Sequence, residues 1–124
     1  MSQADEIREL IQTIDEKPSR LHGDFTPSVK RLSELGLPAV EAILDLLDHP
    51  KLLTRKRAQR VLDGVIMKRF GWEPGFGYPD IARQDQVQQL MAANGSYDAA
   101  APPEDRQQAV EKWRAWIKRE MDNG

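Results

Sequence analysis

The residues of this 124-residue chain that are able to do chemistry are carboxylates, cations, two histidines and a group of aromatic rings. His22 and His49 flank turns without a second histidine at helical spacing, so the sequence predicts no metal site. Asp48 and His49 suit a turn better than an acid–base pair. No cysteine is available as a nucleophile, and no glycine-rich phosphate loop follows a strand. We therefore expect a protein that is not an enzyme, with no catalytic residue, metal or cofactor.

Basic side chains form the strongest candidate site for a partner. Residues 51–70 carry a net charge of +6 (seven cations and Asp63), whereas residues 4–16 carry −4 (five carboxylates and Arg8). Two interpretations stay open: a basic surface that binds a partner, or solvated helix faces joined by ion pairs that contribute little. The candidate residues of this basic surface are Lys30, Arg31, Arg55, Lys56, Arg57 and Arg60.

Aromatic residues form a second candidate site. Four of the eight aromatic residues lie within positions 70–78, and the glycine- and proline-rich segment 71–80 is predicted to be a loop. Turned outward, the rings would anchor a partner. Turned inward, they would close the end of a helical stack, and this arrangement is favoured because a short stack needs closed ends. The candidate residues of this loop are Trp72, Phe76 and Tyr78.

Composition limits the class of protein. An apolar content of 40% and a charged content of 31% suit one helical domain over residues 1–124. No apolar run approaches the roughly 20 residues that cross a bilayer, and the polar N-terminus is not a secretory signal. The lack of cysteine fits a reducing compartment. We expect a cytoplasmic protein that does not bind membranes.

Apolar residues at spacings of three and four predict an all-α fold. Thr26 is expected to cap one helix, Gly36 to end it, and Asp80 to cap another. On the last helix Trp113 and Trp116 share the apolar face, so both are predicted to be core residues that close the stack. The predicted helices cover residues 4–16, 26–36, 38–48, 51–70, 81–94 and 103–122.

The first two pairs of helices repeat one pattern. Ile7, Leu10, Ile11 and Ile14 match Val40, Ile43, Leu44 and Leu47 at an offset of 33, and residues 28–35 match 54–61 at an offset of 26. Self-similarity on this scale indicates a helical solenoid. The second unit, residues 37–70, resembles a HEAT repeat. The positions that carry the resemblance are Asp48, Pro50, Arg55, Ala58 and Leu62.

The resemblance implies a short right-handed α-α superhelix of two units, 4–36 and 37–70, with capping helices 81–94 and 103–122. The final segment is similar to a terminal helix of some bacterial HEAT proteins. The resemblance implies a non-catalytic scaffold that binds another protein, its second helices lining a concave face. Two alternatives stay open: weak nucleic-acid binding by that basic face, and a lyase-like or chaperone-like auxiliary that holds a small molecule at the aromatic loop. The oligomeric state is not predicted.

Overall fold

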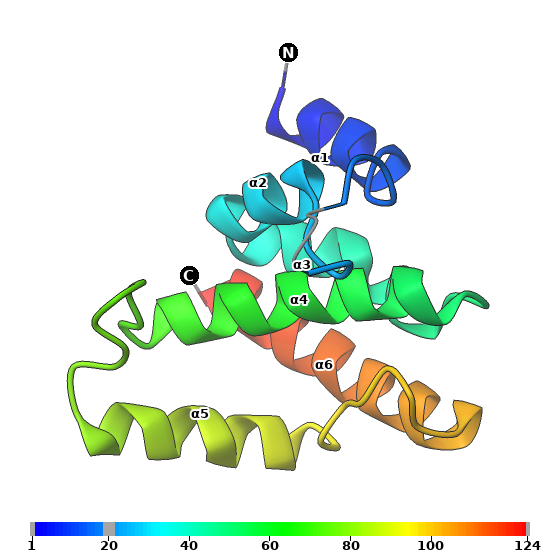
Figure 1. Ribbon diagram of the computed structural model, residues 1–124. Coiled ribbons are helices and arrows are strands. Elements are labelled where there is room, and N and C mark those ends of the chain that lie inside the picture. Colours follow the sequence, from blue (N-terminus) through cyan, green and yellow to red (C-terminus); the bar gives the residue numbers. More distant parts are fainter. Residues whose placement is uncertain (1, 19–21, 124) are drawn as a thin grey trace.

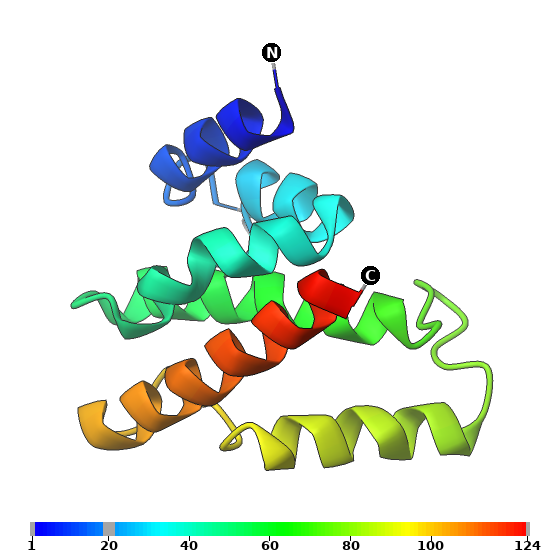
Figure 2. The same ribbon diagram turned by 180° about the vertical axis from the view of Figure 1, so that it is seen from behind.

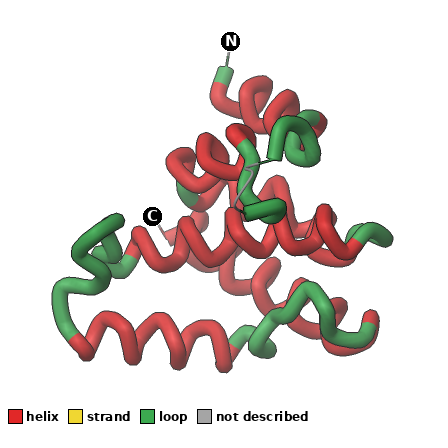
Figure 3. Tube along the Cα trace, in the orientation of Figure 1, coloured by secondary structure: helices red, strands yellow, loops and turns green. Residues whose placement is uncertain are grey.

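The structure, a computed structural model, describes residues 2–18 and 22–123, and this part of the chain is all-helical (Figure 1). The one β pairing in that part is an isolated bridge between Glu73 and Gly77, within the loops coloured green in Figure 3. The all-α prediction is therefore confirmed. The helices are α1 (Gln3–Gln12), α2 (Pro27–Leu35), α3 (Leu37–Ile43), the 3-10 helix η1 (Leu44–Asp48), α4 (Leu52–Arg69), α5 (Ile81–Ala93) and α6 (Pro103–Asn123).

The predicted caps form as the sequence indicates. The Val29 N–H donates to Thr26 Oγ1 at 3.2 Å, and the Arg83 N–H donates to Asp80 Oδ1 at 2.8 Å. These bonds satisfy backbone donors that lack a partner in the first turn of a helix. The buried Thr26 hydroxyl also donates to the Ile14 carbonyl oxygen at 2.9 Å. One residue therefore begins α2 and fixes the chain that follows α1.

Two predicted helices differ in length or type from the structure. The helix expected over 4–16 ends at Gln12, and Thr13 turns the chain while its hydroxyl lies 2.7 Å from that of Ser28. Ile14 lies outside the helix but is still buried. The helix expected over 38–48 becomes the 3-10 helix η1 after Ile43. Apolar spacing locates a buried face, but it does not separate α from 3-10 geometry in the last turn.

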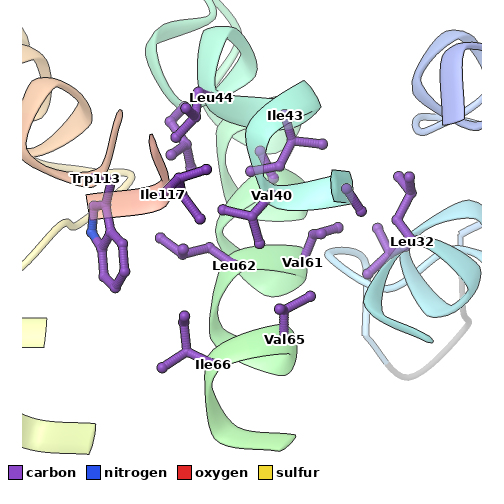
Figure 4. Packing of buried hydrophobic residues seen from close by; sticks show 14 of the residues in the cluster. Leu32, Val40, Ile43, Leu44, Val61, Leu62, Val65, Ile66, Trp113 and Ile117 are labelled. Carbon is purple, nitrogen blue, oxygen red and sulfur yellow. The ribbon is translucent and has the colours of Figure 1, made fainter. Parts of the chain in front are cut away.

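The first four α-helices pack as two helical pairs. Helix α1 packs on α3, and α2 packs on α4. Helix α6 then lies across η1 and α3 (Figure 2). The shared core takes side chains from α2, α3, η1, α4 and α6 (Figure 4). Its fully buried residues include Leu32, Val40, Ile43, Leu44, Leu47, Val61, Leu62, Ile66, Trp113 and Ile117.

The segment that joins α4 to α6 is packed differently, and we call residues 71–94 the arm. Figures 1 and 2 place α5 at the end of the molecule farthest from α1. Val87 is the buried residue of α5, while Leu90 and Met91 are half-buried. The apolar spacing of this helix predicts that Ile81 is buried together with Val87, Leu90 and Met91. This prediction is wrong for Ile81, because its side chain is 76% exposed. Ile81 is the first residue of α5, six residues before the buried Val87.

Two glycines fix where the arm begins and ends. Gly71 follows α4 at φ 93°, and the Trp72 N–H donates to the Met67 carbonyl at 3.1 Å. Gly95 follows α5 at φ 89°, and a Cβ there would lie 3.1 Å from Ala109 Cα. Both helix ends carry the pair of backbone bonds typical of a Schellman motif. A side chain at Gly95 would also push α5 away from α6.

Candidate functional site

Two arginines of the predicted basic surface are buried and belong to the framework of the fold. Arg55 donates from Nε to the Ala99 carbonyl at 2.8 Å and from Nη1 to the His49 carbonyl at 2.7 Å. These bonds join the turn before α4 to the segment before α6. Arg57 donates to the Gly23 carbonyl and pairs with Asp15 at 2.5 Å. The inclusion of Arg55 and Arg57 in an exposed basic surface is therefore corrected, because neither guanidinium is available to a partner.

The Asp15 carboxylate shows why Arg57 turns inward. Burial raises the pKa of Asp15, but hydrogen bonds from Arg57 and Thr54 outweigh it and hold the pKa below its ordinary value. The ionised carboxylate therefore accepts two side-chain bonds across the contact between the helical pairs. A sequence search for charge clusters finds Arg57 but does not find this partner, since Asp15 lies 42 residues away.

The four other basic candidates are exposed, and two of them are paired. Arg31 bonds Glu6 at 2.6 Å, and this bond lowers the pKa of Glu6. Arg60 lies 3.4 Å from Asp24 and stacks over the Phe25 ring. Lys30 and Lys56 lie exposed on α2 and α4. Acidic and basic segments thus form ion pairs with each other in several places. This arrangement agrees with the interpretation of the charge pattern as solvated helix faces joined by ion pairs.

The aromatic loop divides into half-buried rings and one displayed ring. Trp72 and Tyr78 are half-buried, and Tyr78 packs against the core. Phe76 is 86% exposed. The prediction that the loop turns inward is thus wrong for Phe76. The Glu73 N–H donates to the Gly77 carbonyl at 3.0 Å, and the Gly77 N–H donates back at 2.9 Å. These paired bonds close a tight tip around Phe76, which keeps the ring away from the core.

Trp113 lies where the sequence places it, whereas Trp116 is partly exposed. Trp113 is fully buried on α6, and its ring meets that of Trp116 edge-on with centroids 5.4 Å apart. Trp116 is half-buried and packs against the same core. Within the described residues, the buried Trp113 indole N–H has no hydrogen-bond partner. The predicted burial of Trp113 is confirmed.

A groove between residues 22–24 and the outer face of α4 was not predicted as a site. Its volume is about 590 Å³. Asp63 lies along this groove, half-buried, and burial raises its pKa to about 6 although nearby Arg60 lowers it. The sequence holds a signal for Asp63, since it is the single carboxylate of an 18-residue helix that carries six cations. The lining residues are His22, Gly23, Asp24, Leu53, Lys56, Gln59, Arg60 and Asp63.

Metal-binding groups and membrane-spanning helices are both absent from the described residues. The described part of the chain contains no group of three or more histidine or carboxylate side chains arranged to hold a metal ion. The His49 ring accepts a hydrogen bond from the Lys51 N–H at 3.1 Å, as expected of a turn residue. None of the helices described is long and apolar enough to cross a membrane. Comparison with family models, curated proteins and solved structures found no match to this chain.

Proposed function

We propose that this chain is a non-catalytic, HEAT-like module that binds another protein in the cytoplasm, with Phe76 at the centre of the contact. The observation that carries the proposal is the exposure of Phe76 on a tip closed by its own backbone bonds. Large apolar side chains gathered at a surface mark interaction sites. Exposed Ile81 follows five residues later and adds a second apolar group to the same arm.

Energetics favour an aromatic contact of this kind. Burial of one phenylalanine side chain contributes about 1.5–3 kcal/mol, and interface energy concentrates in a few such anchors. The bonds between Glu73 and Gly77 hold the tip in one shape before binding. Ordering of a flexible loop would oppose binding, so a preformed tip keeps more of the burial energy.

The packing of the helices supports the HEAT-like part of the proposal. Repeats of this kind stack equivalent helices on one another. Here the first helices of the two pairs pack together, α1 on α3, and so do the second helices, α2 on α4. We propose that α6, which packs on α3 and η1, closes the stack as its terminal helix.

The two alternative functions have less support. A basic face that binds nucleic acid cannot use Arg55 and Arg57, because both are buried. Arg31 and Arg60 are exposed but already form ion pairs with carboxylates. Replacement of Lys30, Lys56 and Arg60 together tests this alternative, because all three are exposed. A true duplex-DNA site would show a salt dependence of about −0.9 per phosphate contact on a log–log plot. A small-molecule site at the aromatic loop is disfavoured because Phe76 is 86% exposed, whereas Trp72 and Tyr78 are half-buried.

A site-specific photo-crosslinker tests the proposal. The residue p-benzoylphenylalanine replaces Phe76 in one protein and Gln88, an exposed residue of the same arm, in the control. In cell extract we expect a defined crosslink to another protein from position 76 and none from position 88. Excess unmodified chain should compete, whereas excess Phe76→Ala chain should not. Equal crosslinking from both positions, equal competition by Phe76→Ala, or a crosslink to a second copy of this chain would contradict the proposal.

A further inference from the structure

The groove beside α4 is a separate feature from the Phe76 tip, and most of its charged groups already have partners. Arg60 lies between Asp24, at 3.4 Å, and the Phe25 ring, at 5.4 Å from its centroid. The Gln59 side-chain amide donates a hydrogen bond to the Tyr97 carbonyl and accepts one from the Ala99 N–H. These contacts hold the wall of the groove in place but leave Arg60 and Gln59 little capacity to bind a ligand.

Asp63 is the carboxylate of this lining that has no such partner among the described residues. Among the described residues, its carboxylate accepts no hydrogen bond and has no cation within 4 Å, although Asp15, Asp24, Asp45 and Asp48 all have such partners. A half-buried carboxylate that accepts no hydrogen bond loses hydration, and no protein interaction offsets that free-energy cost. Asp63 therefore has unused capacity to accept hydrogen bonds, and it faces a groove open to solvent.

The surroundings of Asp63 favour one class of ligand. The described residues contain no group of three or more side chains that could hold a metal ion, and a lone carboxylate is a poor metal site. Asp63 would repel an anion, which would also compete with Asp24 for Arg60; Lys56, the other cation of the lining, has an exposed side chain that can extend into solvent. A guanidinium or ammonium group fits, because it donates several hydrogen bonds to one carboxylate. Leu53, at the other end of the lining, offers apolar surface for a flanking segment.

We propose that the groove between residues 22–24 and α4 binds an arginine or lysine side chain of a protein partner, with Asp63 as its acceptor. This inference takes from the proposed function only that the partner is a protein, and it does not depend on Phe76. A partner would then contact the chain through an apolar group at Phe76 and a cationic group in the groove, which is lined on α4 by residues between 53 and 63.

The test uses small probes, so it does not depend on knowing the partner. The ¹⁵N-labelled full chain is titrated with N-acetyl-arginine amide, N-acetyl-lysine amide and N-acetyl-glutamate amide, and amide shifts are followed by NMR. We expect the two cationic probes to bind in the millimolar range and to shift residues 22–24 and 59–63, while the anionic probe does not. Asp63→Asn should weaken cation binding about tenfold, the effect of one charged hydrogen bond at a partly exposed site.

Two control variants separate this inference from the Phe76 proposal. Asp85→Asn removes an exposed carboxylate from α5 and should leave binding unchanged. Phe76→Ala should also leave it unchanged, so failure of the crosslinking experiment would not affect the groove. Equal affinity in Asp63→Asn, equal shifts with the glutamate probe, or no shift with any probe would overturn the inference. Spermidine binding at least about tenfold tighter than either amino-acid probe would overturn the protein side chain as the ligand source.

Discussion

Helices α4 and α5 are neighbours in the chain, but they are used in different ways. Helix α4 buries eight of its 18 residues and contacts α2, α3 and η1. Helix α5 buries one of its 13 residues and makes few contacts with any other helix. The free energy of folding therefore concentrates around α4, while the arm contributes little. A region whose packing contributes little to stability is free to display apolar groups such as Phe76 and Ile81.

The largest expected effect comes from removing the ring that joins α6 to the core. Trp113 is fully buried, so Trp113→Ala should cost about 3–5 kcal/mol in free energy of unfolding, measured by chemical denaturation. Trp116→Ala should cost less, because Trp116 is half-buried. Equal costs for the two variants would mean that α6 does not pack as described.

A matched pair of truncations compares α4 and α5 directly. Leu62→Ala on α4 should cost about 2–5 kcal/mol, because a cavity opens between α3 and α6. Val87→Ala on α5 should cost about 1 kcal/mol, since fewer neighbours surround it and the site can collapse. The measurement is urea denaturation of both variants. A cost for Val87→Ala as large as that for Leu62→Ala would remove the distinction between core and arm.

A smaller effect with the opposite sign is expected at Asp63. Its pKa is about 6 in the folded protein against an ordinary value of 3.8, so the folded state holds this proton more tightly than the unfolded chain. The free energy of unfolding should therefore fall as pH rises from about 4 to about 6, by at most about 3 kcal/mol and by less because Asp63 is half-buried. Asp63→Asn should remove this slope and stabilise the protein at pH 7.

Thermal denaturation of the wild-type chain and the Asp63→Asn variant across that pH range checks this prediction. The Asp85→Asn variant serves as the exposed control. Stability that rises with pH through the Asp63 range, or a variant less stable than wild type at pH 7, would contradict the unpaired state of this carboxylate.

The smallest stability effect is expected at the tip of the arm. Phe76 is 86% exposed, so Phe76→Ala should change the free energy of unfolding by no more than about 0.5 kcal/mol. Circular dichroism and denaturation measure this change, and the crosslinking competition measures binding in the same variant. A destabilisation near that of Val87→Ala would show that the ring packs against the protein rather than facing solvent.

The sequence predicted the helices well because their signals are local. Thr26 and Asp80 cap the predicted helices, and the spacing of Val40, Ile43, Leu44 and Leu47 gave the buried face of α3 and η1 correctly. Periodicity failed at Ile81, because it marks an apolar face but not whether a neighbour covers it. The repeat itself and the HEAT-like arrangement remain predictions.

The candidate site was less predictable because charge and exposure depend on distant partners. In the sequence Arg57 resembles a surface cation, but in the folded chain it is buried and paired with Asp15. Asp63 carried a signal, a lone carboxylate on a basic helix, but its half-buried position follows from tertiary packing. The direction of Phe76 depends on two backbone bonds between Glu73 and Gly77, which glycine content alone does not specify.

Native-state hydrogen exchange tests the division between core and arm most directly. Amides of α4 around Val61 and Leu62 should exchange only when the whole protein unfolds, with a free energy of exchange equal to that of global unfolding. Amides of α5 around Val87 should exchange through a local opening of lower free energy, and Trp113→Ala should change the first group far more than the second. Equal protection of α4 and α5, falling together in Trp113→Ala, would contradict the account.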